Sequence, residues 1–137
     1  MDDSTVVITL AEQLAARTTW VWRPTGAAYT PDEVGIFYGP IGETIDQGVG
    51  LTLYNTTDDI PTGLAERRIQ LHYRGDPGNP KGADDLAQVA FGVLHGLSRV
   101  AGLNLVRRAL VAPLGTDGNG RQERADSYLI TIDNTEA

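Results

Sequence analysis

The stretch "RRIQLHYRGDPGNPKGADDLAQVAFGVLHGL", residues 67–97, changes its hydrophobic period in the middle. In its first half Ile69, Leu71 and Tyr73 alternate with polar residues, which predicts a strand with one apolar face. In its second half the apolar residues recur at helical spacing and share one face: Leu86, Val89, Ala90, Val93, Leu94 and Leu97. The order of the two periods predicts a half-buried strand that is followed, through a turn, by an amphipathic helix.

The residues around Asp85 indicate where this helix begins. Asp85 and Gln88 have the spacing of a capping box, so the helix is expected to begin near Asp84 or Asp85. Gly96 and Gly102 are expected to mark its fraying end.

Upstream, the patterns predict a helix followed by several strands. A helix is expected over residues 4–17, a short aromatic strand over 20–22, a strand over 34–38 and another over 49–54. The segment "NTTDDIPTG", residues 55–63, has the composition of a turn.

Downstream, two further strands are expected around Arg107 to Leu114 and Asp126 to Asp133. The connecting segment "GTDGNGRQERA" is too polar and glycine-rich to pack, so we expect a long hairpin with a mobile tip. No βα repeat occurs along the chain. The pattern therefore predicts one α+β domain over residues 1–137, with two helices packed on one face of a mainly antiparallel sheet.

Composition narrows the class of protein. A chain of 137 residues with 41% hydrophobic residues suits a single domain. It has no apolar run near the ~20 residues of a membrane helix, and Met1-Asp2-Asp3 lacks the order of a signal peptide, so we expect a soluble protein with no membrane partner. It has no cysteine, which excludes disulfides, thiolate zinc sites and cysteine nucleophiles. The formal charge is −7, and adjacent basic residues occur only as two pairs, which disfavours tight nucleic-acid binding.

Three ligand motifs can be weighed on their chemistry. Arg74-Gly75-Asp76 is better explained as a strand end and a turn than as an adhesion site. A phosphate loop is disfavoured because the G-x-x-x-x-G-K-[ST] order is missing and acidic residues occupy the helix start. The segment from Asp117 to Arg121 begins like a calcium loop, but Arg121 stands where an oxygen ligand is needed. We therefore expect no metal and no cofactor.

The candidate catalytic residues are few. His72 lies on the polar side of a strand, and His95 is three residues before Ser98 on the second helix. Neither has an orienting acid or an elbow motif nearby, so no catalytic residue is predicted and the protein is not expected to be an enzyme. A small hydrolase or ligand-binding domain stays the alternative, and it requires a pocket that brings one histidine together with carboxylates.

The order of elements resembles a known family, the tail-terminator proteins of long-tailed bacteriophages, also called tail-completion or minor capsid proteins. The resemblance rests on the N-terminal helix, "GVGLTLYNT", "RRIQLHYRGDPGNP", "ADDLAQVAFGVLHGL" and "RRALVAPLGTDGNGRQERADSYLITI", and it spans nearly the whole chain. Its most specific part is the strand that ends in Arg-Gly, followed by a proline loop and a helix.

The resemblance implies a structural virion protein. Such proteins form a ring, usually a hexamer, at the head-proximal end of the tail tube, where they stop polymerisation and bind the head-completion protein. DNA passes through the lumen without specific binding, and assembly takes place in the host cytoplasm. A head-completion or other neck connector protein is the neighbouring interpretation.

Subunit and partner contacts are expected in three segments that are rich in aromatic or charged residues, since aromatic residues and arginine are favoured at interfaces. The segments are a middle aromatic stretch, the loop before the second helix and the tip of the last hairpin. The interface residues expected there are Ile36, Phe37, Tyr38, Arg74, Asp76, Lys81, Asp117, Arg121 and Arg124.

Overall fold

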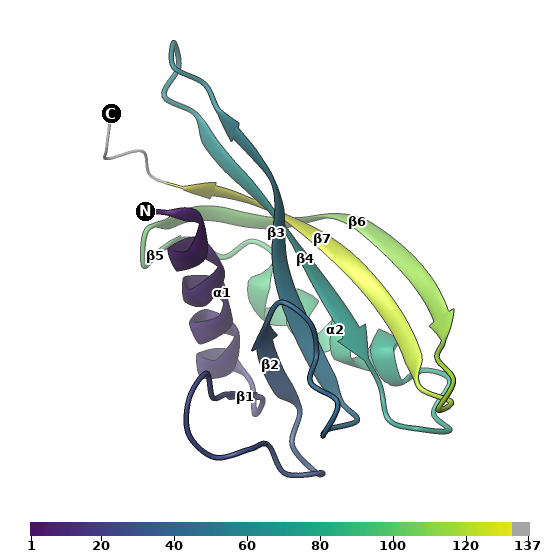
Figure 1. Ribbon diagram of the computed structural model, residues 1–137. Coiled ribbons are helices and arrows are strands. Elements are labelled where there is room, and N and C mark those ends of the chain that lie inside the picture. The colour runs from purple at the N-terminus through teal and green to yellow at the C-terminus, as the bar shows by residue number, and fades with distance from the viewer. Residues whose placement is uncertain (133–137) are drawn as a thin grey trace.

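The computed structural model describes residues 1–132, and it has the predicted α+β fold (Figure 1). In chain order the elements are α1 (Asp3–Arg17), β1 (Val21–Trp22), β2 (Gly35–Tyr38), β3 (Gly48–Asp58), β4 (Ala65–Arg74), α2 (Gly82–Leu94), β5 (Ser98–Val100), β6 (Leu103–Thr116) and β7 (Gln122–Ile132). Asp133, the expected end of the last strand, lies outside the described residues.

The strands form one seven-stranded sheet in the order β1-β2-β3-β4-β7-β6-β5. The neighbours β1, β2 and β3 run parallel, and every other pair is antiparallel. The mainly antiparallel sheet and the long C-terminal hairpin of β6 and β7 are therefore confirmed.

Both helices pack on the same face of the sheet. Leu10 and Leu14 of α1 and Leu94 of α2 are fully buried, and they belong to one hydrophobic cluster with Leu71 and Ile130 of the sheet. The predicted alternation in β4 holds, because Ile69, Leu71 and Tyr73 all face this core. No helix within residues 1–132 is long and apolar enough to span a bilayer.

The second helix begins two or three residues earlier than predicted. α2 begins at Gly82, its N-cap residue Lys81 makes no side-chain cap, and the Asp85–Gln88 box is not used. Gln122 of β7 supplies the cap, since its side-chain oxygen accepts hydrogen bonds from the backbone N–H groups of Ala83, at 2.9 Å, and Asp84, at 3.2 Å. A partner distant in sequence therefore replaces the local signal.

The helix ends at Leu94, before Gly96, and the following residues do not fray. They form β5, which pairs with the start of β6 through Ser98↔Leu105 and Val100↔Leu103. Gly102 has a φ of +86° in the tight turn between these strands, a conformation that favours glycine.

The segment predicted as a turn at residues 55–63 is partly strand. β3 continues to Asp58, and its last residues pair with the start of β4, from Asn55↔Arg68 to Asp58↔Ala65. Thr56 and Thr57 are β-branched, which suits an extended conformation. The resulting two-stranded projection, residues 55–68, extends beyond the rest of the molecule (Figure 1), and we call it the arm.

The last hairpin also differs from expectation. β6 reaches Thr116 and β7 begins at Gln122, so the connection is only residues 117–121. The expectation that the whole polar segment 115–125 cannot pack is wrong, because most of it lies in the β6–β7 ladder and glycines serve the turn itself.

Candidate docking surface

Three loops meet at one end of the sheet, and we call them together the loop end. They are residues 39–47, 75–81 and 117–121. The backbone N–H of Gly78 donates to the carbonyl of Gly120 at 3.0 Å, and Arg121 Nη1 lies 3.2 Å from Asp46 Oδ1. Two of the three predicted interface segments are thus neighbours in space.

Arg74 holds the first of these loops from inside. Its guanidinium donates to the backbone carbonyls of Asp46 and Gly42, both at 2.9 Å, and to that of Ile45. The side chain is only 6% exposed, and burial together with the nearby Arg121 cation lowers the pKa of Arg74. Arg74 therefore has no surface to offer a partner, and an adhesion role for the tripeptide does not fit its position.

Glycines allow two of these loops to pack closely, one against β3 and the other against the start of α2. A Cβ on Gly50 would lie 2.2 Å from the carbonyl oxygen of Gly39, and a Cβ on Gly75 would lie 2.6 Å from the backbone of Gly82. Both distances are far inside van der Waals contact. Glycine at Gly50 and Gly75, where the backbones approach most closely, is therefore required for the loop end to pack as it does.

The hairpin tip is closed by its own hydrogen bonds. Asp117 accepts from the backbone N–H groups of Arg121, at 3.0 Å, and Asn119, at 2.9 Å, and from Arg121 Nε at 2.8 Å. These bonds, first of all the one from the Arg121 backbone, lower the pKa of Asp117. The oxygens that a calcium loop would use are thus already occupied, and no cluster of metal ligands occurs among residues 1–132.

Arg121 and Arg124 are also engaged within the subunit. Arg121 is 6% exposed, between Asp117 and Asp46. Arg124 Nε lies 2.8 Å from Asp126, a fully buried carboxylate, and its Nη1 lies 3.2 Å from Asp84. Both residues were expected at an interface, but the structure uses them to tie strands, loops and α2 together.

The start of α2 is closed to a phosphate. Gln122 accepts from the first free N–H groups of the helix, and its amide nitrogen donates to Asp84 Oδ2 at 2.9 Å. The hydrogen bond from Gln122 lowers the pKa of Asp84, so a carboxylate stands at the position that an anion would take.

The two histidines are not brought together. His72 Nε2 lies 2.9 Å from Glu123 Oε1 on the face of the sheet away from the helices. His95, after α2, accepts the backbone N–H of Arg108 at its Nδ1 and stacks on Phe91 at 4.6 Å between ring centroids. The hydrolase alternative needs a pocket that brings one histidine together with carboxylates. His72 does meet one carboxylate, Glu123, but this pair lies on the sheet face that neither helix covers. His95 is held by the backbone of Arg108 and the ring of Phe91.

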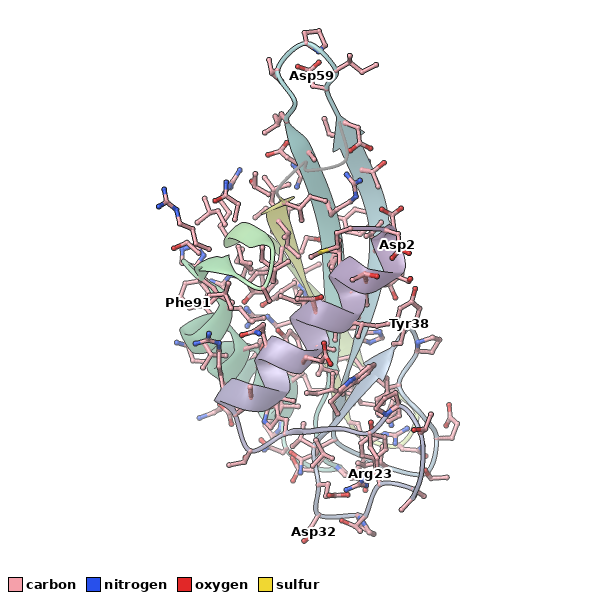
Figure 2. All side chains as sticks on the ribbon, turned by 90° about the vertical axis from the view of Figure 1, so that its left-hand side faces the viewer. Asp2, Arg23, Asp32, Tyr38, Asp59 and Phe91 are labelled. Atoms are coloured by element: carbon pink, nitrogen blue, oxygen red, sulfur yellow. The ribbon has the colours of Figure 1, made fainter. Side chains whose placement is uncertain are left out.

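The aromatic segment splits into buried and exposed residues. Ile36 is fully buried beneath α1, and Phe37 packs against the ring of Tyr29 with centroids 4.8 Å apart. Tyr38 is 55% exposed at the end of β2 (Figure 2). It lines a hollow with Asp3 and Leu53. Of these three expected contact residues, Tyr38 presents the most surface.

The sequence did not single out the face of the sheet that neither helix covers. In register across it, Arg68 of β4, Leu129 of β7 and Arg107 of β6 stand side by side. In the next row Tyr54 donates to Ser127 Oγ at 2.9 Å, beside the exposed Leu110. Tyrosine and arginine on an open sheet are typical of a protein interface. Strand alternation alone would have marked this side only as polar.

A comparison with known protein families gives a match for this chain. No curated protein is similar enough to count as a match. Residues 14–134 match the family described as bacteriophage tail terminator protein, which includes the whole sheet, α2 and the loop end. Because the match covers nearly the entire chain, this chain belongs to the bacteriophage tail terminator family and is a structural protein of the phage tail.

Proposed function

We propose that this protein assembles as a ring, a hexamer, on the head-proximal end of the phage tail tube. There it stops tube polymerisation and provides the joint to the head-completion or connector complex. The observation that carries the proposal is the family match over residues 14–134. The single sheet and single core of residues 1–132 support treating the whole chain as one ring subunit.

Termination follows from shape and not from chemistry in this proposal. One face of the ring is complementary to the tube subunit and the other is not, so addition of further tube subunits ends. Each subunit contributes a weak contact, and the contacts act together once the ring has formed. A rigid subunit favours this, because its loops lose little conformational freedom on docking.

The contact residues follow from exposure. Within the loop end, Asp76 is partly exposed and Lys81 is exposed, and Tyr38 is exposed at the end of β2. The buried residues Ile36, Arg74 and Arg121 support these surfaces from inside. We assign the loop end and Tyr38 to partner contacts with the tube or the head-completion protein.

The charge of the protein is compatible with a DNA channel. The formal charge of −7 disfavours a tight grip on phosphates, and Arg74, Arg121 and Arg124 are engaged in internal contacts. In the proposed ring, DNA passes through the lumen without specific binding. The protein then resides at the head–tail junction of the virion after assembly in the host cytoplasm.

The test uses purified tail tubes that still elongate. Added protein is expected to cap one tube end, visible by electron microscopy as an extra ring, and to halt elongation. A Lys81→Glu/Tyr38→Ala variant should cap less well, whereas Arg17→Glu, a charge change at the C-terminal end of α1 and outside the loop end, should cap normally. Continued elongation with no bound ring would overturn the proposal, and binding to heads but not tubes would favour a neck connector.

A further inference from the structure

Two strand edges of the sheet lack a partner over part of their length. β2 pairs with β3 only as far as Tyr38↔Leu51, whereas β3 continues to Asp58. Within the part of the chain that the structure describes, residues 52–58 therefore have no strand beside them on that side. We call this segment the β3 edge.

The second edge belongs to β6. β5 pairs with β6 only as far as Leu105, and the residues before β5 bond to Val106. The N–H of Arg108 is taken by the His95 ring. From there to Thr116 no strand lies on the outer side of β6 among residues 1–132, and we call residues 109–116 the β6 edge.

Exposed apolar side chains distinguish the β6 edge. Leu110 is 62% exposed, and Val111 and Leu114 are about half exposed, on a strand whose outer backbone groups are unpaired. Such an edge is a template for pairing with another chain, and soluble proteins usually blunt it. Here only Pro113 and register irregularities interrupt it, and no charged residue lies between Ala109 and Thr116.

The charges at the two edges are complementary. The β3 edge ends in Asp58, which pairs with Arg67 but keeps 59% of its side chain exposed, and it is followed by Asp59. The β6 edge is preceded by Arg107 and by Arg108, which pairs with Asp126 of its own subunit. Arg107 is exposed and forms no ion pair with the described residues. In an antiparallel pairing the acidic end of the β3 edge would lie beside Arg107 and Arg108, whereas in a parallel pairing it would lie at the uncharged end near Thr116.

The directions of the strands select the antiparallel pairing. β3, β4, β7 and β6 are linked by three antiparallel ladders, so β3 and β6 of one subunit run in opposite directions. Rotation about an axis roughly along the strands keeps the direction of every strand. A neighbouring copy placed by such a rotation therefore brings its β3 antiparallel to β6.

We propose that the β3 edge of one subunit pairs antiparallel with the β6 edge of the next copy of this chain. This contact rests on the proposed ring, and it identifies the two surfaces through which neighbouring subunits of that ring bind each other. It joins different patches of the two copies, so it repeats from subunit to subunit until the ring closes. Backbone hydrogen bonds supply the pairing, and the Asp–Arg contacts fix its register.

The absence of cysteine in the sequence allows a direct test by cross-linking. Thr57 and Leu110 share the uncovered face, as does Ala112. The double variants Thr57→Cys/Leu110→Cys and Thr57→Cys/Ala112→Cys are expected to form disulfides between copies on mild oxidation, since cross-strand Cβ atoms lie within reach. A ladder of covalent oligomers up to the closed ring should appear on a non-reducing gel.

Matched controls separate this contact from random oxidation. Thr57→Cys/Val89→Cys pairs the same edge with an exposed position on α2, and it should not form the ladder. Arg107→Glu should raise the concentration needed for half assembly by about tenfold, because it places like charges together, and Arg17→Glu should not.

The outcomes distinguish this contact from the proposed function. Rings that cap tubes without cross-linking at either pair would overturn the edge pairing and leave the function intact. If the single variant Leu110→Cys formed dimers and the two double variants formed no ladder, β6 would pair with the β6 of a second copy. That result would also overturn the proposed pairing of β3 with β6. A protein that neither forms rings nor binds tubes would remove both proposals.

Discussion

At the scale of single residues, arginine acts mainly as an internal connector in this protein. Arg74 bonds three backbone carbonyls of one loop, and Arg121 and Arg124 pair with carboxylates from other parts of the chain. An arginine in a turn-rich segment looks exposed in the sequence. Its long side chain nevertheless reaches acceptors that only the fold brings near, and burial then removes it from the surface.

Gly50 gives a residue-scale prediction about the loop end. Gly50→Ala places a Cβ against the Gly39 carbonyl, so we expect the free energy of unfolding to fall by about 1–3 kcal/mol. Gly92→Ala is the matched control, because α2 has open space there, and it should raise stability by up to about 1 kcal/mol. Urea unfolding measures both, and an unchanged Gly50→Ala would mean that the loop does not sit on β3 as described.

Glu33 gives a second prediction, on pH. Hydrogen bonds from Arg23, and then from Thr30, lower the pKa of Glu33 from 4.5 to about 2. Because the folded pKa lies below the ordinary value, Glu33 stabilises the fold above pH 4.5, and this contribution is lost as the pH falls from 4.5 towards 2. An NMR titration of the carboxyl carbon should show the low pKa, Arg23→Met should raise it, and Arg17→Met should leave it unchanged.

At the scale of elements, α2 shows how a strand can decide where a helix begins. The local signal at Asp85 was plausible, but the side chain of Gln122 binds the backbone of Ala83 and Asp84 and lets the helix start earlier. The β6–β7 hairpin thus caps a helix that precedes it by almost forty residues. The contact also ties α2 to the loop end.

This cap can be tested by exchanging the two candidate residues. Gln122→Ala should lower the free energy of unfolding by about 1 kcal/mol, as for other lost N-caps, whereas Asp85→Ala should change it little. Thermal and urea unfolding compare the two variants. A larger loss from Asp85→Ala than from Gln122→Ala would contradict the observed cap and restore the capping box.

At the scale of the whole molecule, the core and the projecting parts are separate. The core lies between the sheet and the two helices, while Ile60, at the tip of the arm, is 95% exposed. A two-stranded hairpin adds little stability outside a core. The arm is therefore better explained by assembly than by folding.

Shortening the arm tests this separation. Thr57 and Glu66 are opposite each other, so residues 58–65 can be replaced by an Asn-Gly turn. We expect near-parental circular dichroism and cooperative unfolding, because nearly all of the core is outside the deleted segment. Ring assembly, followed by sedimentation, should weaken because Asp58 and Asp59, the acidic end of the β3 edge, are gone; unimpaired rings would show that the outer part of the arm is dispensable for assembly.

The sequence by itself determined the fold class, the buried face of α1 and the alternation of the long strands, because each depends on a period between near neighbours. For α2 the predicted face was only partly right, because Val89, expected on the buried side, is 45% exposed, whereas Ala87 is fully buried. Tertiary structure decided the start of α2, the length of β3, the burial of Ile36, Arg74 and Arg121, and the uncovered sheet face. It alone also placed Gly78, in the loop before α2, beside Gly120 of the hairpin tip. These features depend on hydrogen bonds and burial between residues far apart in sequence, as between Gln122 and Ala83 or Arg74 and Gly42, and no local pattern records such contacts.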